Sequence, residues 1–215
     1  MKDPTRLIAD AVRIGMARLA RSLNTLTKGK LLPAHITILS FLGHIPAVWA
    51  LWNCRPNAAA VGLVAVVLLH NLDSALAEVQ KNRSGVFGMF RELLNASKEL
   101  LVFVGLAAFT AQHDTDVRTW VLVAAAGTSL LHGYVGLTAR TAAAQAKVTA
   151  DLQLATGLVG YGFRMVLIIV GLLTENLAPV LHFMIALNML AVALTFLTAA
   201  QSLSTAPKRK TQNHG

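Results

Sequence analysis

The sequence predicts an all-α integral membrane protein with six transmembrane helices and an N-terminal amphipathic helix at the membrane interface. Three observations favour this fold class. The 215 residues are 55% hydrophobic and only 13% charged, and the mean hydropathy of +0.58 is too high for a domain with a water-exposed surface. The apolar residues form segments long enough to cross a hydrocarbon core of about 30 Å. Lysine and arginine also gather on one side of these segments.

The first element is an amphipathic juxtamembrane helix within residues 1–30. Asp3 and Pro4 form a favourable helix start, because a carboxylate can cap the N-terminus and proline fits the first turn. Apolar residues recur on one side of the helix and arginines on the other. We interpret it as an interfacial helix on the inner leaflet. An ordinary cytoplasmic helix packed on the bundle is the alternative.

A six-helix transmembrane domain follows at residues 31–203, and a basic tail at 204–215, predicted to be disordered, ends the chain. The spans are predicted at 35–53, 57–77, 86–111, 117–139, 153–174 and 177–200. The outer loops then contain only Arg55 and Arg118 as basic residues. By the positive-inside rule, we expect a multi-pass protein of the inner or plasma membrane with cytoplasmic N- and C-termini.

The formal net charge of +9 raises the question of a nucleic-acid partner. The basic residues mostly flank the spans, so attraction to the anionic headgroups of membrane lipids explains them better than nucleic-acid binding does. The single cysteine, Cys54, has no partner for an intramolecular disulfide.

The second and third spans contain the strongest functional signal. Polar and ionisable residues repeat at helical spacing in both, namely His70, Asn71, Asp73, Ser74 and Glu78, then Gly88, Arg91, Glu92, Asn95, Lys98 and Glu99. A charge at the bilayer centre costs about 2.5–3.5 kcal/mol on insertion scales, and such residues usually face the bundle interior and mark a site. We therefore expect one polar cavity that opens toward the cytoplasm.

Arginines of later spans are further candidates for this cavity. Arg140, at the cytoplasmic end of the fourth span, either anchors the helix at the headgroups or contacts substrate. Arg164 has apolar residues on both sides. We expect it to pair with a cavity carboxylate or to receive an anionic substrate. His44, beside Pro46, is better explained by packing than by ligand binding.

The hairpin resembles the CDP-alcohol phosphatidyltransferases, whose motif is D-x2-D-G-x2-A-R-x8-9-G-x3-D-x3-D. The corresponding residues run His70-x2-Asp73-Ser74-x2-Ala77-Glu78, then, after nine residues, Gly88-x3-Glu92-x3-Ala96. The stretches LLPAHIT and GYVGLTARTAA, together with Arg164, extend the resemblance over nearly the whole chain. It implies a homodimeric membrane enzyme of phospholipid biosynthesis that transfers a substituted phosphate from a CDP-linked donor to an alcohol.

In this family the motif aspartates hold a divalent metal, so the resemblance implies Mg²⁺ or Mn²⁺ as cofactor. Asp73 is the one motif aspartate that remains, and Glu78 replaces the motif arginine. In a second register, one residue shorter, Arg91 and Asn95 take the last two aspartate positions. Neither register restores four carboxylates, so the metal can also be absent.

The resemblance assigns catalytic roles to His70, Asp73, Glu92 and Asn95, with Asp73, Glu92 and His70 as possible metal ligands. It assigns substrate binding to Ser74, Ala77, Glu78, Gly88, Arg91, Lys98, Arg140 and Arg164. Two functions stay open. One is a divergent transferase that uses a CDP-linked lipid or CDP-alcohol. The other is a catalytically inactive relative, a pseudoenzyme in which internal ion pairs replace the metal and which binds a lipid or nucleotide or partners an active homologue. A transporter ranks last, because no inverted repeat is detectable.

Overall fold

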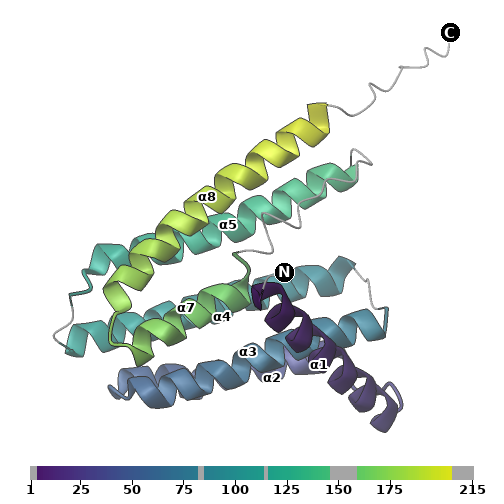
Figure 1. Ribbon diagram of the computed structural model, residues 1–215, viewed down its shortest axis with the longest axis horizontal. Helices are drawn as coiled ribbons and strands as arrows, with labels where there is room; N and C mark the ends of the chain where they lie inside the picture. The colour runs from purple at the N-terminus through teal and green to yellow at the C-terminus, as the bar shows by residue number, and fades with distance from the viewer. Residues whose placement is uncertain (1–3, 82–84, 114–115, 146–158, 205–215) are drawn as a thin grey trace.

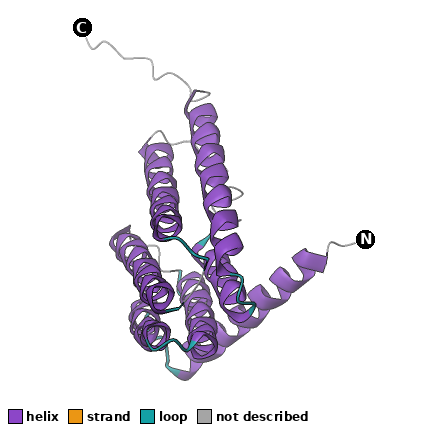
Figure 2. Cartoon of the chain, turned by 90° about the vertical axis from the view of Figure 1, so that its left-hand side faces the viewer, coloured by secondary structure: helices purple, strands orange, loops and turns teal. Residues whose placement is uncertain are grey.

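The computed structural model describes residues 4–81, 85–113, 116–145 and 159–204, and within this part of the chain every regular element is a helix (Figures 1 and 2). The helices are α1 (Pro4–Leu26), α2 (Pro33–Trp52), α3 (Pro56–Val79), α4 (Gly85–Gln112), α5 (Thr119–Gln145), α7 (Tyr161–Leu173) and α8 (Leu177–Ser204). The predicted all-α fold class is confirmed.

Five of these helices are long and apolar enough to cross a membrane, namely α2, α3, α5, α8 and the Phe90–Gln112 part of α4. The span predicted at 153–174 is represented by α7 alone, because residues 146–158 lie outside the described part of the chain. The predicted tail at 204–215 lies outside it too, apart from Ser204. The helices at the spans predicted at 117–139 and 177–200 extend beyond those spans, to Gln145 and Ser204.

Tight turns make α2 and α3, and likewise α7 and α8, consecutive neighbours at the ends predicted to face outward. Cys54 and Glu175 follow α2 and α7 with positive φ angles of 54° and 56°. The next residue in each case donates its amide back to the helix, Arg55 to the Ala50 carbonyl at 2.9 Å and Asn176 to the Gly171 carbonyl at 3.0 Å. This is the Schellman ending, here made without glycine at the left-handed position.

The helices form two groups. α2 packs against α3 and α4, and α3 packs against α7, whereas α5 and α8 pack on each other. The α5–α8 pair meets the other group near the α4–α5 and α7–α8 connections and diverges from it toward the opposite end (Figure 1). The core is fully buried where the first group meets α8, as Leu51, Leu63, Leu106, Met165 and Leu181 show.

A glycine allows close contact between α2 and α3. A Cβ atom at Gly62 would lie 3.1 Å from Ala47 Cβ and 3.5 Å from Ala47 Cα. Neither the Ala47 backbone nor its methyl group can rotate away. The short distance between the axes of α2 and α3 therefore requires a residue without a side chain at position 62.

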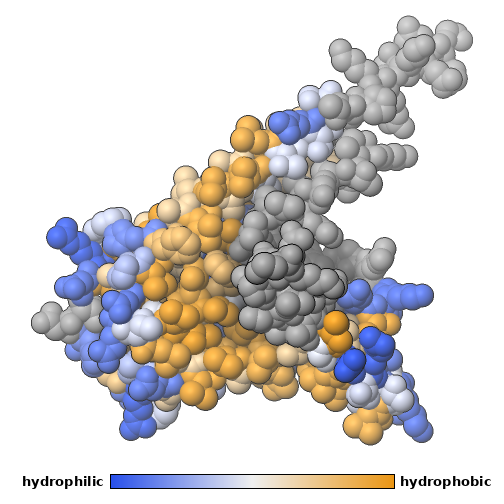
Figure 3. Space-filling view, in the orientation of Figure 1, coloured by the Kyte–Doolittle hydropathy of each residue, from blue (hydrophilic) through white to orange (hydrophobic). Residues whose placement is uncertain are grey.

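The surface is that of a protein in a hydrocarbon environment. Large apolar side chains such as Trp49, Val61 and Phe196 are 64%, 71% and 67% exposed. In Figure 3 apolar residues cover the middle of the visible face and hydrophilic residues gather at its ends. A water-soluble domain rarely exposes so large an apolar area, so the structure supports the predicted membrane location.

The second half of α1 packs on the first turns of α2 and the last turns of α3, the ends predicted to face the cytoplasm. Ala20 is fully buried in a small cluster with Ile36, Leu72 and Leu76. Gln80, directly after α3, donates from Nε2 to Asn24 Oδ1 and to the Leu31 carbonyl, both at 2.8 Å. The helix thus contacts the bundle as the alternative interpretation expected, and its position relative to the membrane interface stays a prediction.

Candidate functional site

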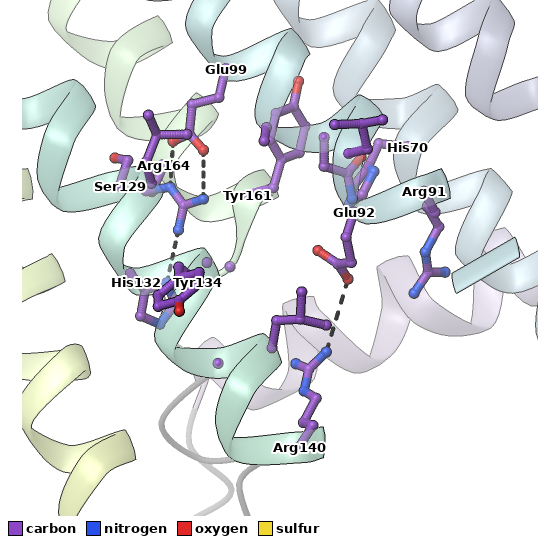
Figure 4. A pocket seen from close by; sticks show the side chains of 18 of the residues that line it. His70, Arg91, Glu92, Glu99, Ser129, His132, Tyr134, Arg140, Tyr161 and Arg164 are labelled. Carbon is purple, nitrogen blue, oxygen red and sulfur yellow. Dashed lines mark hydrogen bonds and ion pairs between the residues drawn. The ribbon is translucent and has the colours of Figure 1, made fainter. Parts of the chain in front are cut away.

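A cavity of about 490 Å³ lies between α3, α4, α5 and α7 (Figure 4). It is formed by the last turns of α3 and α5 and the first turns of α4 and α7, the helix ends predicted to face the cytoplasm. Seven predicted site residues line it: His70, Ser74, Arg91, Glu92, Asn95, Arg140 and Arg164. Polar residues of the second and third spans therefore share one cavity, as expected.

The other predicted site residues lie elsewhere. Asp73 and Lys98 are fully buried and are not among the cavity-lining residues. Ala77 and Glu78 lie further toward the end of α3, outside the lining, and Glu78 is exposed. Gly88 falls in the first turns of α4, where the structure describes only the backbone.

Arg164 forms a buried ion pair with Glu99 of α4 (Figure 4). Its Nε donates to Glu99 Oε1 at 2.6 Å and its Nη2 to Oε2 at 2.8 Å, a two-pronged contact. Its Nη1 donates to the Val159 carbonyl and to His132 Nδ1, the latter at 3.2 Å. Of the two expected roles for Arg164, the structure shows the pairing with a carboxylate, which joins α4, α5 and α7 along the cavity wall.

Glu92 and Arg140 form a much looser pair across the cavity mouth (Figure 4). Glu92 Oε1 and Arg140 Nη1 are 3.9 Å apart, and the two side chains are 39% and 53% exposed. Such exposed pairs contribute about 0–1 kcal/mol. Both side chains are therefore free to contact a ligand that enters the cavity.

Tyr161 connects the cavity to a buried histidine of α2. His44 Nδ1 lies 2.6 Å from the Ser40 carbonyl, which can only accept, so Nδ1 carries the proton and Nε2 accepts the hydroxyl proton of Tyr161. The His70 ring packs edge-on against the Tyr161 ring, with centroids 4.7 Å apart. His44 is thus a structural residue, as expected.

Tyr161 was not predicted as a cavity residue, whereas His132 was expected with Arg140 on the side where the cavity opens. Tyr161 is one of only two tyrosines in the chain and begins α7 one turn before Arg164. Its spacing of three residues from Arg164 could have indicated that both side chains face the same cavity. His132 lies two helical turns before Arg140 in α5, which places both on one face.

Asp73 is a buried carboxylate whose electrostatic neighbours include two cations of α4. Both carboxylate oxygens are buried, and neither accepts a hydrogen bond from the described residues. The neighbours that act on it electrostatically are Arg91 and Lys98, together with the Thr37 hydroxyl. Thr37 donates its one proton to the Pro33 carbonyl at 3.0 Å. Both cations belong to α4, and the register of the third span stays a prediction.

The side chains present do not fit a divalent metal as arranged. In the described part of the chain, no three His, Cys, Asp or Glu side chains lie close enough together to hold an ion. Asp73 lies behind the cavity wall, His70 lines the cavity, and Glu92 pairs with Arg140 at the mouth. A hard cation such as Mg²⁺ prefers several converging oxygen ligands, and the described residues of this site do not provide such a set.

Comparison with solved structures confirms the predicted resemblance at the level of the fold. The chain is similar to the phosphatidylinositol phosphate synthase of Mycobacterium tuberculosis, solved with CDP-DAG bound, with a TM-score of 0.64 and 20% identity over 90% of this chain and 95% of that one. That synthase is a CDP-alcohol phosphatidyltransferase. No family model and no curated protein matches the sequence. The chain is therefore an all-helical membrane protein with the CDP-alcohol phosphatidyltransferase fold.

Proposed function

We propose that this protein is a divergent CDP-alcohol phosphatidyltransferase-like protein of phospholipid metabolism, which binds a CDP-linked lipid in the cavity between α3, α4, α5 and α7. The observation that carries the proposal is Arg91. It lines the cavity, and its buried Nε has no acceptor among the described residues. Guanidinium groups suit phosphate oxygens because their N–H donors are planar and always charged. The CDP-DAG in the similar synthase supports the choice of ligand.

The cavity-lining residues also suit transfer to an alcohol. In that reaction the acceptor hydroxyl oxygen forms a bond to the lipid-side phosphorus, the bond from that phosphorus to the oxygen of CMP breaks, and the hydroxyl proton goes to a base. His70 lines the cavity, and its Nδ1 has no hydrogen-bond partner among the described residues. We assign the base role to this imidazole. Arg91 and Arg140 would hold the diphosphate charge during transfer.

A binding protein without catalysis is the second candidate. It is favoured by the absence of a carboxylate cluster in the described part of the chain and by the two cations that act electrostatically on Asp73. Both candidates require a CDP-linked lipid in the same cavity. They differ in whether CMP is released when an alcohol is added.

The binding step is tested by ligand-induced stabilisation of the detergent-purified full chain. CDP-diacylglycerol should raise the unfolding temperature more than phosphatidic acid or phosphatidylcholine does, since a ligand at 100 times its Kd stabilises by about 2.7 kcal/mol. Arg91→Gln should weaken binding about ten- to hundredfold, which corresponds to the loss of charge-assisted hydrogen bonds. Arg118→Gln, at an exposed position on the predicted outer side, is the matched control.

Equal stabilisation by all three lipids, or an unchanged affinity in Arg91→Gln, would refute the proposed ligand site. A CMP-release assay with a panel of alcohols then separates the two candidates. Release that His70→Gln abolishes identifies a transferase. Tight binding without release for any alcohol supports the binding protein.

A further inference from the structure

One face of α4 presents cations and an amide to the buried carboxylate of α3. Arg91, Asn95 and Lys98 recur at intervals of four and three residues, so they lie on one side of the helix. Lys98 of α4 and Asp73 of α3 are both fully buried. Arg91 and Lys98 are the two cations that act electrostatically on Asp73.

The hydrogen bond from Lys98 determines which group of the Asn95 amide remains available to the cavity. Lys98 Nζ donates to Asn95 Oδ1 at 3.3 Å, and an ammonium group can only donate. The amide oxygen of Asn95 therefore faces Lys98, and its two N–H donors remain for other partners. Because Asn95 lines the cavity, this polarity makes it a hydrogen-bond donor to a ligand. An amide in this position cannot accept a proton from an acceptor hydroxyl.

A buried carboxylate needs a compensating cation, because isolated charges are costly to remove from water. A divalent metal would supply this charge if the family motif were intact, as the resemblance implies. Here the buried ammonium of Lys98 lies over the Tyr161 ring, 6.0 Å from its centroid, and acts electrostatically on Asp73. A second cation bound at Asp73 would be repelled by both Lys98 and Arg91.

We propose that Lys98 is a built-in replacement for the divalent cation, so that this cavity takes a phosphate-bearing ligand on Arg91 and Asn95 without a metal. Lys98 is a positioning residue, since it acts through Asp73 and Asn95 and does not line the cavity. The ligand part of this inference rests on the proposed function. The metal part rests only on Asp73 and Lys98.

Manganese binding to the metal-free, detergent-purified full chain tests the metal part without any lipid. Electron paramagnetic resonance of free Mn²⁺ should detect no Asp73-dependent binding to the wild-type protein at millimolar concentrations. Lys98→Met keeps the length of the side chain and removes its charge, so this variant should gain weak Mn²⁺ binding at Asp73. Adding Asp73→Asn should abolish that site again. Lys30→Met, at an exposed loop position, should gain nothing.

Wild-type protein that binds Mn²⁺ and loses it in Asp73→Asn would overturn the proposal, and this result needs no Lys98 variant to fold. A folded Lys98→Met, or Lys98→Gln if the methionine variant does not fold, that gains no site would overturn it as well. CDP-diacylglycerol affinity in EDTA should equal that in Mn²⁺ within about twofold. Affinity that rises tenfold or more with Mn²⁺ contradicts metal independence, whereas no lipid binding under either condition contradicts only the proposed function.

Discussion

Arg164 and Glu99 illustrate how the bundle accommodates charge. Each oxygen of the Glu99 carboxylate accepts one guanidinium N–H, and the remaining nitrogen of Arg164 donates to α5 and to the backbone before α7. Glu92, about two turns earlier on α4, has only the exposed contact at 3.9 Å with Arg140. The ion pair of Glu99 should therefore contribute much more to stability than that of Glu92, although both glutamates lie in similar stretches of the sequence.

Glu99→Gln should destabilise the protein by about 3–5 kcal/mol, because it leaves the Arg164 guanidinium buried without its counter-charge. Glu92→Gln is the matched control and should cost no more than about 1 kcal/mol. Unfolding in detergent, followed by circular dichroism, measures both. Similar losses for the two variants would show that the buried pair has no special role.

Tyr161→Phe should also destabilise the protein, by about 1–3 kcal/mol, since it leaves the acceptor nitrogen of His44 buried without a donor. Tyr134, whose side chain is 67% exposed, provides the control, and Tyr134→Phe should have little effect. The same unfolding measurement applies. A Tyr161→Phe variant as stable as the wild-type protein would contradict the tautomer assigned to His44.

Helical spacing predicted which polar residues share a face, and this was enough to place His70, Ser74, Arg91 and Asn95 around one cavity. Helical spacing could not predict how deeply each side chain is buried behind the cavity wall. Asp73 follows His70 by three residues and was expected in the same site, yet it is fully buried and does not line the cavity. The choice of the Arg164 partner likewise depends on helix packing, which spacing within single spans does not contain.

At the scale of helices, apolar length predicted five of the described elements to within a few residues, apart from the inner ends of α5 and α8. The sequence TARTAAAQ extends α5 beyond the hydrocarbon core, because alanine-rich segments continue a helix regardless of polarity. Membrane insertion length and helix length are separate quantities, and hydropathy reports only the first. The packing of α2 on α3 was not predicted, since it depends on a contact between two spans.

That contact gives a prediction for the α2–α3 pair. Gly62→Leu should destabilise the bundle by about 1–3 kcal/mol, because its side chain would meet the Ala47 backbone. A side chain at Gly127 of α5 would meet nothing within 4 Å, so Gly127→Leu should be neutral or slightly stabilising. Thermal unfolding in detergent compares the two. Equal tolerance at both positions would contradict the close packing of α2 on α3.

At the scale of the whole molecule, the cavity lies at the ends of four helices that the charge pattern assigns to the cytoplasm. The single cysteine, Cys54, lies in the turn between α2 and α3 at the other end. A membrane-impermeant maleimide should therefore label Cys54 in intact cells. In a Cys54→Ser background, a cysteine at Lys81 should react only after permeabilisation. The reverse pattern would place the cavity and both termini on the outer side.

The homodimer implied by the family resemblance is a separate prediction at this scale. Crosslinking in membranes, followed by the size of the product, checks it. A protein that stays monomeric at increasing crosslinker concentration would contradict it.

The central claim is that the cavity beside Arg91 and Asn95 holds the diphosphate of a CDP-linked lipid. The most direct measurement is an experimental structure of the full chain in lipid nanodiscs with CDP-diacylglycerol, determined in EDTA. We expect phosphate density in hydrogen-bonding contact with the Arg91 guanidinium and the Asn95 amide, with Lys98 still buried. A headgroup bound outside this cavity, or density there only when a divalent metal is supplied, would contradict the account.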